Sequence, residues 1–190
     1  MSVAPSLLCA AETSQLVIID VQVRLAAAMP ATSRDQVVRN SGNLLQAAAL
    51  LGIPSHVTEQ YPKGLGHTEP DVAQHLGADQ APVCKTCFAS SGAAGFNEQL
   101  DAHQGRHQVI LAGMETHVCV LQTALELQTR GYQVFVVEDA VSSRTETNRQ
   151  NALARLRQGG VIVSNTESVL FEWLRDASHP HFKMISALIK

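Results

Sequence analysis

Strand-like and helix-like segments alternate along the whole 190-residue chain, with no linker, internal repeat or low-complexity tract between them. The strand-like runs are short and rich in Val, Ile and Leu, as is typical of parallel strands that are buried on both faces. This alternation predicts one domain over residues 1–190, a three-layer α/β/α Rossmann-like fold with a six-stranded parallel sheet and right-handed crossovers. We expect the strands at 16–21, 54–58, 82–85, 107–112, 131–139 and 160–163.

The segments between these strands predict helices at 33–51, 95–102, 119–130, 145–158, 166–176 and 182–190. Residues 33–36, Ser-Arg-Asp-Gln, have the pattern of a capping box that opens the first of them. Residues 60–70 contain two prolines and two glycines. Because these residues interrupt regular structure, we expect a surface loop there.

The composition fits a globular protein, since 45% of the residues are hydrophobic and 16% are charged. The formal net charge is −3 and the basic residues are scattered, so nucleic-acid binding is not expected. No apolar stretch reaches the roughly 18 residues of a membrane span, and the N-terminus lacks a signal-peptide pattern. We therefore expect a cytoplasmic protein that does not bind membranes, with its cysteines as free thiols.

The run Gly-Met-Glu-Thr-His-Val-Cys-Val at 113–120 joins a predicted strand to a predicted helix and places Cys119 in the first helical turn. Free backbone N–H groups and the positive end of the helix dipole favour a thiolate there. The same N–H groups could receive a developing oxyanion. This position makes Cys119 a candidate nucleophile.

Candidate partners of Cys119 follow two other predicted strands. Asp20 closes the first strand and Lys85 closes the third. Parallel sheets bind ligands beyond the carboxyl ends of their strands, so the three side chains should converge. Alone, each has a simpler explanation: a helix cap, a solvated lysine and a small core residue. Together they predict a base, a cation and a nucleophile.

The chain resembles the isochorismatase-like cysteine hydrolases, a family that includes nicotinamidases and N-carbamoylsarcosine amidases. The resemblance covers nearly the whole chain and depends on Asp-Val-Gln at 20–22, Lys-Thr-Cys-Phe at 85–88 and the run at 113–120. Residues 58–66 and 139–144 are most similar to isochorismatase-domain-containing proteins whose substrate is unassigned.

The resemblance implies a catalytic triad of Cys119 as nucleophile, Asp20 as general base and acid, and Lys85 as the cation that holds both in their charged forms. It also implies a cis peptide before Val118, with the N–H groups of Val118 and Cys119 as an oxyanion hole. The reaction would cleave a C–N bond of a small amide-like substrate through a thioester, without a cofactor. The resemblance further implies a homo-oligomer, a dimer or larger.

Two departures narrow this expectation. Nicotinamidases carry a metal site at a D-x-H segment after the second strand, whereas Glu-Gln-Tyr at 59–61 lacks the histidine, so no metal is expected. True isochorismatases have a glycine where this chain has Cys119. The resemblance therefore predicts a metal-independent cysteine hydrolase of the amidase type and leaves the substrate open.

The expected substrate contacts are Gln60, Tyr61, Phe88 and His117. Each has an alternative, since aromatic residues at loop edges often serve packing and His117 could simply pack beside the turn. Arg144 could bind an anionic group or form a structural ion pair.

Two other functions remain open at this stage. The chain could be a noncatalytic scaffold or ligand-binding member of the same fold. It could also be a thiol redox sensor that uses Cys84 and Cys87, which form a C-x-x-C pattern. A structural zinc at this pair is not expected, because no second ligand pair of comparable spacing exists.

Overall fold

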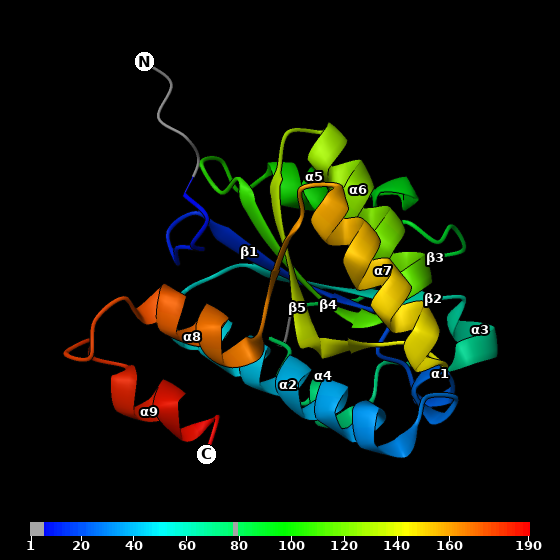
Figure 1. Ribbon diagram of the computed structural model, residues 1–190, viewed down its shortest axis with the longest axis horizontal. Coiled ribbons are helices and arrows are strands. Elements are labelled where there is room, and N and C mark those ends of the chain that lie inside the picture. The colour runs from blue at the N-terminus through cyan, green and yellow to red at the C-terminus, as the bar shows by residue number, and fades with distance from the viewer. Residues whose placement is uncertain (1–5, 78–79) are drawn as a thin grey trace.

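The computed structural model describes residues 6–77 and 80–190 and contains the predicted six-stranded, all-parallel sheet (Figure 1). The strands lie in the order β3-β2-β1-β4-β5-β6, which places β1 and β4 side by side at the centre. Their bounds are β1 Ser14–Ile19, β2 Ser55–Gln60, β3 Val83–Lys85, β4 Gln108–Met114, β5 Gln133–Ser142 and β6 Ile162–Ser164. The predicted three-layer fold is confirmed.

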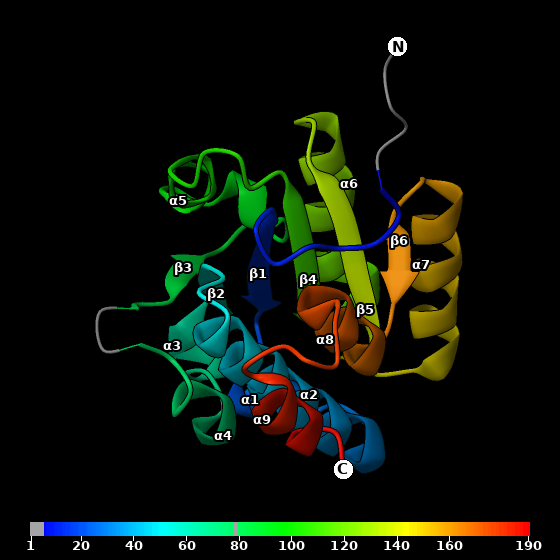
Figure 2. The same ribbon diagram turned by 90° about the vertical axis from the view of Figure 1, so that its left-hand side faces the viewer.

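Helices cover both faces of the sheet. Helices α2, α8 and α9 pack on one face, which Figure 2 shows towards the viewer, and α5, α6 and α7 pack on the other. The bounds are α1 Val23–Ala27, α2 Ala31–Leu50, α3 Pro62–Leu65, α4 Pro70–Ala73, α5 Phe96–Asp101, α6 Leu121–Thr129, α7 Glu146–Gln158, α8 Thr166–Leu174 and α9 Phe182–Ala187. None of these described helices has the length and hydropathy needed to cross a bilayer.

Strand β1 illustrates how the sequence specifies this arrangement. Leu16 and Ile18 join the core beneath α2 and α8, whereas Val17 and Ile19 join the core beneath α5, α6 and α7. Successive side chains of a strand point to opposite faces, so a continuous apolar run supplies both cores. Every residue of β1 is buried.

Two sequence expectations about helix starts were wrong. Helix α2 begins directly after Pro30 without a side-chain cap, and the hydroxyl of Ser33 instead donates to the Pro30 carbonyl at 3.0 Å. The segment 60–70 is not an irregular loop throughout, because α3 starts at Pro62 and α4 at Pro70. Proline is favoured at a first helical position, where its missing N–H would have no partner, so these residues begin helices rather than prevent them.

The ends of β1 and β4 approach each other closely at Gly113. This residue has a φ of +125°, and a Cβ built on it would lie 1.9 Å from the Ile19 carbonyl oxygen. Only glycine fits such a contact. Gly113 therefore allows the segment that leads to Cys119 to pass directly beside Ile19, the residue before Asp20.

Candidate active site

Asp20 follows β1 with a left-handed backbone, at a φ of 52°. Its carboxylate is fully buried and accepts two short hydrogen bonds. The Thr58 hydroxyl donates to Oδ1 at 2.6 Å, and the Lys85 ammonium donates to Oδ2 at 2.6 Å. A left-handed, non-glycine residue is costly and is often found at functional sites. The two bonds fix the orientation of the carboxylate.

Lys85 is the last residue of β3, and its side chain is also fully buried. Besides Asp20, its Nζ donates to Gln60 Oε1 at 2.8 Å, to the Phe88 carbonyl at 2.9 Å and to the Cys87 carbonyl at 3.3 Å. Removing an ammonium from water is unfavourable unless a counter-charge and further acceptors replace the water. Lys85 has both, so it forms a satisfied, buried ion pair with Asp20.

Cys119 lies in a single π-helical turn, Thr116–Val120, that continues into α6. Its thiol lies close enough to the Asp20 carboxylate and the Lys85 ammonium for both charges to act on it. π-Helical turns inside helices are often found at functional sites. The structure thus brings together the three residues of the predicted triad.

The pKa of Cys119 is shifted in the direction opposite to the one that the helix start predicts for a thiolate. The pKa of the thiol is raised to about 12, mainly by burial; the Asp20 carboxylate also raises it, and Lys85 lowers it. Cys119 is only 5% exposed, so the loss of hydration outweighs the helix dipole. The raised pKa favours a neutral Cys119 thiol.

The expected cis peptide before Val118 was wrong. That peptide lies inside the π-helical turn, and the cis bond is instead Met114–Glu115, just before the turn. The N–H groups of Val118 and Val120 both donate to the Glu115 carbonyl, at 3.1 and 3.2 Å. The Val118 N–H thus already has an acceptor in this conformation.

The expected substrate-binding residues occupy different settings. Gln60 contacts Lys85 through Oε1 and the Thr86 carbonyl through Nε2, at 2.8 Å each. Tyr61 and Phe88 are each 54% exposed, and both are tied to Lys85 through the backbone. The Tyr61 N–H donates to the Lys85 carbonyl at 2.8 Å, and the Phe88 carbonyl accepts from the Lys85 ammonium.

His117 and Arg144 connect the π-helical turn and the residue before it to the segment after β5. The His117 ring lies 2.9 Å from the Ser143 hydroxyl through Nδ1 and 3.4 Å from the Asn148 amide through Nε2. The Arg144 backbone N–H and Nε donate to Glu115 Oε2 at 3.0 and 3.1 Å. Arg144 therefore forms the structural ion pair, the second of the two roles the sequence left open.

Comparison with known proteins agrees with this geometry. The isochorismatase domain model matches residues 14–168. The isochorismatase domain-containing protein 2 of Bos taurus is 46% identical over 156 residues, which cover 82% of this chain and 74% of the relative. The chain belongs to the isochorismatase family.

Solved structures of this family's fold superpose closely. The MAR1 ribonuclease from Caenorhabditis elegans has a TM-score of 0.88 at 37% identity, over 95% of this chain and 91% of that one. The YcaC gene product from Escherichia coli, described as an octameric hydrolase of unknown specificity, also has a TM-score of 0.88, at 23% identity over 98% and 91% of the two chains. The second likeness shows the fold alone.

Glu59 begins the Glu-Gln-Tyr segment at 59–61, for which the sequence predicts no metal site. Glu59 is buried and accepts from the Thr68 N–H at 2.7 Å, from the Thr68 hydroxyl at 2.8 Å and from the His67 ring at 3.0 Å. Over residues 6–77 and 80–190, no three His, Cys, Asp or Glu side chains are grouped to hold a metal ion. The Glu59 carboxylate thus already accepts hydrogen bonds from other groups of the protein.

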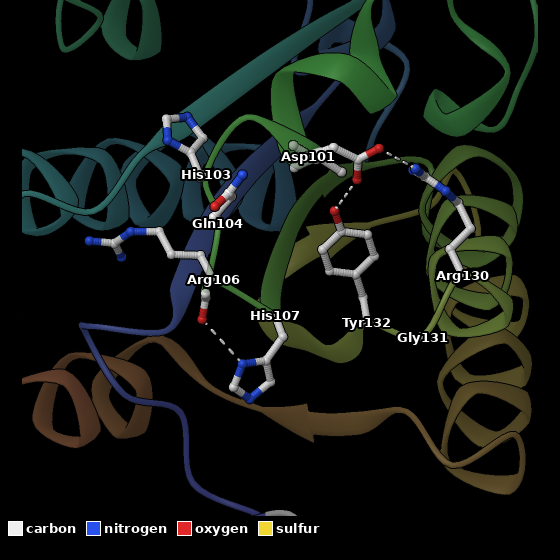
Figure 3. Close-up of a pocket in the computed structure, with 10 residues that line it drawn as sticks. Asp101, His103, Gln104, Arg106, His107, Arg130, Gly131 and Tyr132 are labelled. Carbon is white, nitrogen blue, oxygen red and sulfur yellow. Dashed lines mark hydrogen bonds and ion pairs between the residues drawn. The ribbon is translucent and has the colours of Figure 1, made fainter.

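A separate pocket of about 310 Å³ lies at the amino ends of the strands, where β4 and β5 begin (Figure 3). Asp101 accepts there from the Tyr132 hydroxyl at 2.6 Å and from Arg130 at 2.8 Å. The pKa of Tyr132 is raised to about 12 by burial and by its hydrogen bond to Asp101. These polar groups thus form hydrogen bonds with one another. The predicted triad lies at the opposite, carboxyl ends of the strands.

Sequence reasoning missed residues that hold the triad in place. Thr58 lies on β2 two positions before Gln60, so the strand period puts both on the face that meets Asp20 and Lys85. That period could have identified Thr58. Gln22 carries the family's D-x-Q signature, and its amide bonds both the N–H and the carbonyl of Gln60 and the carbonyl of Gly66. No sequence signal reveals those partners.

Proposed function

We propose that this protein is a cysteine hydrolase that cleaves a C–N bond of a small amide-like substrate through a thioester, without a resident metal ion. The observation that carries the proposal is the buried Asp20–Lys85 pair, 2.6 Å apart, beside the Cys119 thiol. A buried carboxylate next to a neutral thiol is placed to accept its proton. Family membership supports hydrolase chemistry in general.

In the first half of the proposed reaction, Asp20 takes the Cys119 proton as the sulfur attacks the substrate carbonyl. Because the pKa of the thiol is raised to about 12, proton transfer accompanies attack rather than preceding it. Lys85 offsets the negative charge of the attacking sulfur. Collapse expels the amine, which takes the proton back from Asp20, and leaves an acyl group on sulfur.

In the second half, Asp20 takes a proton from water as the water oxygen attacks the thioester carbonyl. The acid leaves, and Cys119 regains its proton. We propose the N–H groups of Val118 and Cys119 as donors to the oxyanion in both halves. The Val118 N–H donates to Glu115 at rest, so the oxyanion must share or displace that bond.

We propose that Tyr61 and Phe88 recognise the substrate. Both side chains are exposed, and the backbone of each residue is hydrogen-bonded to Lys85. Apolar and aromatic walls around a few polar groups are typical of small-molecule sites. Gln60 would act by holding Lys85, and His117 would contact substrate by exchanging its bond to Ser143. We also propose a cytoplasmic homo-oligomer, a dimer or larger, which light scattering can test.

The proposed function is tested by a screen of small amides, ureides and aryl esters, read as released ammonia, amine or acid. We expect at least one class to be hydrolysed by the wild type and not by Cys119→Ala. Ligand binding without turnover across the screen would favour the noncatalytic alternative.

RNA is the second substrate class to test, because the MAR1 neighbour is described as a ribonuclease and is 37% identical to this chain. The net charge of −3 argues against it, since RNA binding is driven largely by basic residues. We expect labelled RNA to remain intact at concentrations of enzyme that hydrolyse the best amide. Cleavage that Cys119→Ala abolishes would support the ribonuclease function instead.

A further inference from the structure

The two cysteines of the C-x-x-C segment, Cys84 and Cys87, differ in their exposure and in what they pack against. In β3, Val83 and Lys85 are buried and Cys84 between them is exposed. Val83 packs in the core cluster that contains Cys119, so Cys84 points away from that cluster. Cys87, after the strand, is half-buried and packs against the same cluster.

The chain after Cys87 is bonded to α6, the helix that continues from the π-helical turn holding Cys119. The Ser90 N–H donates to the Thr123 hydroxyl at 2.9 Å, and the Ser91 hydroxyl bonds Glu126. Thr123 lies about one helical turn after Cys119. Cys87 precedes Ser90 by three residues in the sequence, so this path leads back towards the start of the helix.

Lys85 links the two thiols from the other side. Its ammonium donates to the Cys87 carbonyl at 3.3 Å, and its charge also acts on the Cys119 thiol. The Cys87 sulfur rests against Gly92, where an added Cβ would lie 3.2 Å away. Cys87 is therefore held on the side of the triad, while Cys84 is not.

We propose that Cys87 and Cys119 form a reversible disulfide on exposure to a peroxide, so that Cys87 is a thiol-oxidation site of this protein. Half-buried Cys87 is the more accessible of the two to the oxidant, since Cys119 is 5% exposed. Disulfide partners need Cβ atoms about 3.8 Å apart, which favours two thiols on the same side of the sheet.

The chemistry uses one peroxide molecule for each disulfide. The Cys87 sulfur attacks one peroxide oxygen, the O–O bond breaks, and a sulfenic acid and hydroxide form. The Cys119 sulfur then displaces the sulfenic oxygen, which leaves as water after taking up protons, and the S–S bond forms. Two thiols are oxidised and hydrogen peroxide is reduced to two waters.

The consequence is that the proposed nucleophile becomes unavailable while it is protected from irreversible oxidation to sulfinic acid. Only this consequence depends on the proposed function. Formation of the disulfide depends on the placement of the two thiols alone.

Trypsin can test the pairing, because Lys85 separates the cysteines of the C-x-x-C segment. Cys84, Cys87 and Cys119 fall in the peptides 64–85, 86–106 and 107–130. After brief treatment with hydrogen peroxide and blocking of free thiols, we expect peptide 86–106 to be linked to 107–130. Iodoacetamide labelling of Cys119 in denatured protein should be lost and then restored by dithiothreitol.

Single variants complete the test. In Cys87→Ser, Cys119 should stay available for labelling after peroxide, whereas the matched variant Cys84→Ser should behave like the wild type. A link between 64–85 and 86–106, no link at all, or equal loss of Cys119 labelling in Cys87→Ser would each overturn the proposal. If the disulfide forms but no amide or ester is hydrolysed before oxidation, the oxidation site stands and the proposed function fails.

Discussion

The sheet holds a carboxylate, a cation and a hydroxyl group at the carboxyl ends of its strands, here called the carboxyl edge. It holds the same three kinds of group, in different surroundings, at the amino ends of its strands, here called the amino edge. Asp20, Lys85 and the Thr58 hydroxyl meet at the carboxyl edge, with bonds of 2.6 Å. Asp101, Arg130 and the Tyr132 hydroxyl meet at the amino edge, with bonds of 2.6 and 2.8 Å. The geometry is similar, so bond lengths alone do not identify a catalytic site.

Burial and the presence of the proposed nucleophile distinguish the two edges. The side chains of Asp20 and Lys85 are 0% exposed, whereas those of Asp101 and Arg130 are 55% and 30% exposed. Exposed ion pairs are screened by water and contribute little, while buried charges depend strongly on their partners. A thiol, that of Cys119, lies beside Asp20 and Lys85, whereas no described thiol acts on Asp101, so matched substitutions at the two edges should have very different effects.

The largest expected difference concerns hydrolysis. Cys119→Ala should lower kcat/KM for the best amide or ester by at least about a thousandfold, since loss of a nucleophile removes the covalent route. Tyr132→Phe at the amino edge should leave it unchanged. Steady-state kinetics on both variants check this, and comparable losses would remove the functional distinction between the edges.

The next difference concerns stability. Asp20→Asn should destabilise the protein by about 3–5 kcal/mol, because the buried Lys85 ammonium loses its paired carboxylate. Asp101→Asn should leave the free energy of unfolding within error of the wild type, since water replaces the lost contacts. Urea unfolding of the two variants makes the comparison. A small effect of Asp20→Asn would mean that its pair with Lys85 is not buried in solution.

A smaller effect is expected from the hydroxyl groups. Thr58→Val should cost about 1.5–3 kcal/mol of stability, because Asp20 loses a bond to a charged group in a dry site. Thr58→Ser should restore most of it. Thr123→Val is the control, since Thr123 is equally buried but its hydroxyl accepts from the uncharged Ser90 N–H. Equal losses in the two valine variants would show that Thr58 has no special role for Asp20.

The smallest effect is a pH dependence. Because the pKa of the Cys119 thiol is raised to about 12, its iodoacetamide alkylation should rise up to about tenfold per pH unit through neutral and mildly alkaline pH. In Asp20→Asn the thiol loses a neighbouring negative charge, so its pKa should fall and alkylation at pH 8 should accelerate. Peptide mass spectrometry of 107–130 measures the rates. A plateau below pH 8 in the wild type would show a stabilised thiolate instead.

The sequence predicted the convergence of Asp20, Lys85 and Cys119 because each ends or follows a strand, and parallel strands end at one edge. It could not predict the side-chain partners, which depend on how loops return to that edge. Gln60 was expected to bind substrate, yet it holds Lys85. The prediction of a lowered thiol pKa at Cys119 was wrong, because position in a helix says nothing about burial. Burial is the main cause of the raised pKa of this thiol.

Similar reasoning explains the other fold-level differences. Pro62 and Pro70 are loop signals in a sequence, but each starts a helix once its neighbours supply the remaining hydrogen bonds. The six strands were predicted from local composition. Their order depends on crossovers that no local pattern records, and it is this order that sets β1 beside β4 and Asp20 beside the π-helical turn.

The central claim is that Cys119, served by Asp20 and Lys85, is the acyl-accepting nucleophile. The most direct measurement is mass spectrometry of tryptic peptides after rapid acid quench of the wild type with an activated aryl ester such as p-nitrophenyl acetate. We predict a transient acyl group on peptide 107–130 that decays as acid is released and is absent in Cys119→Ala. Acylation of peptide 86–106 instead, or hydrolysis with no acyl group on 107–130, would contradict the account.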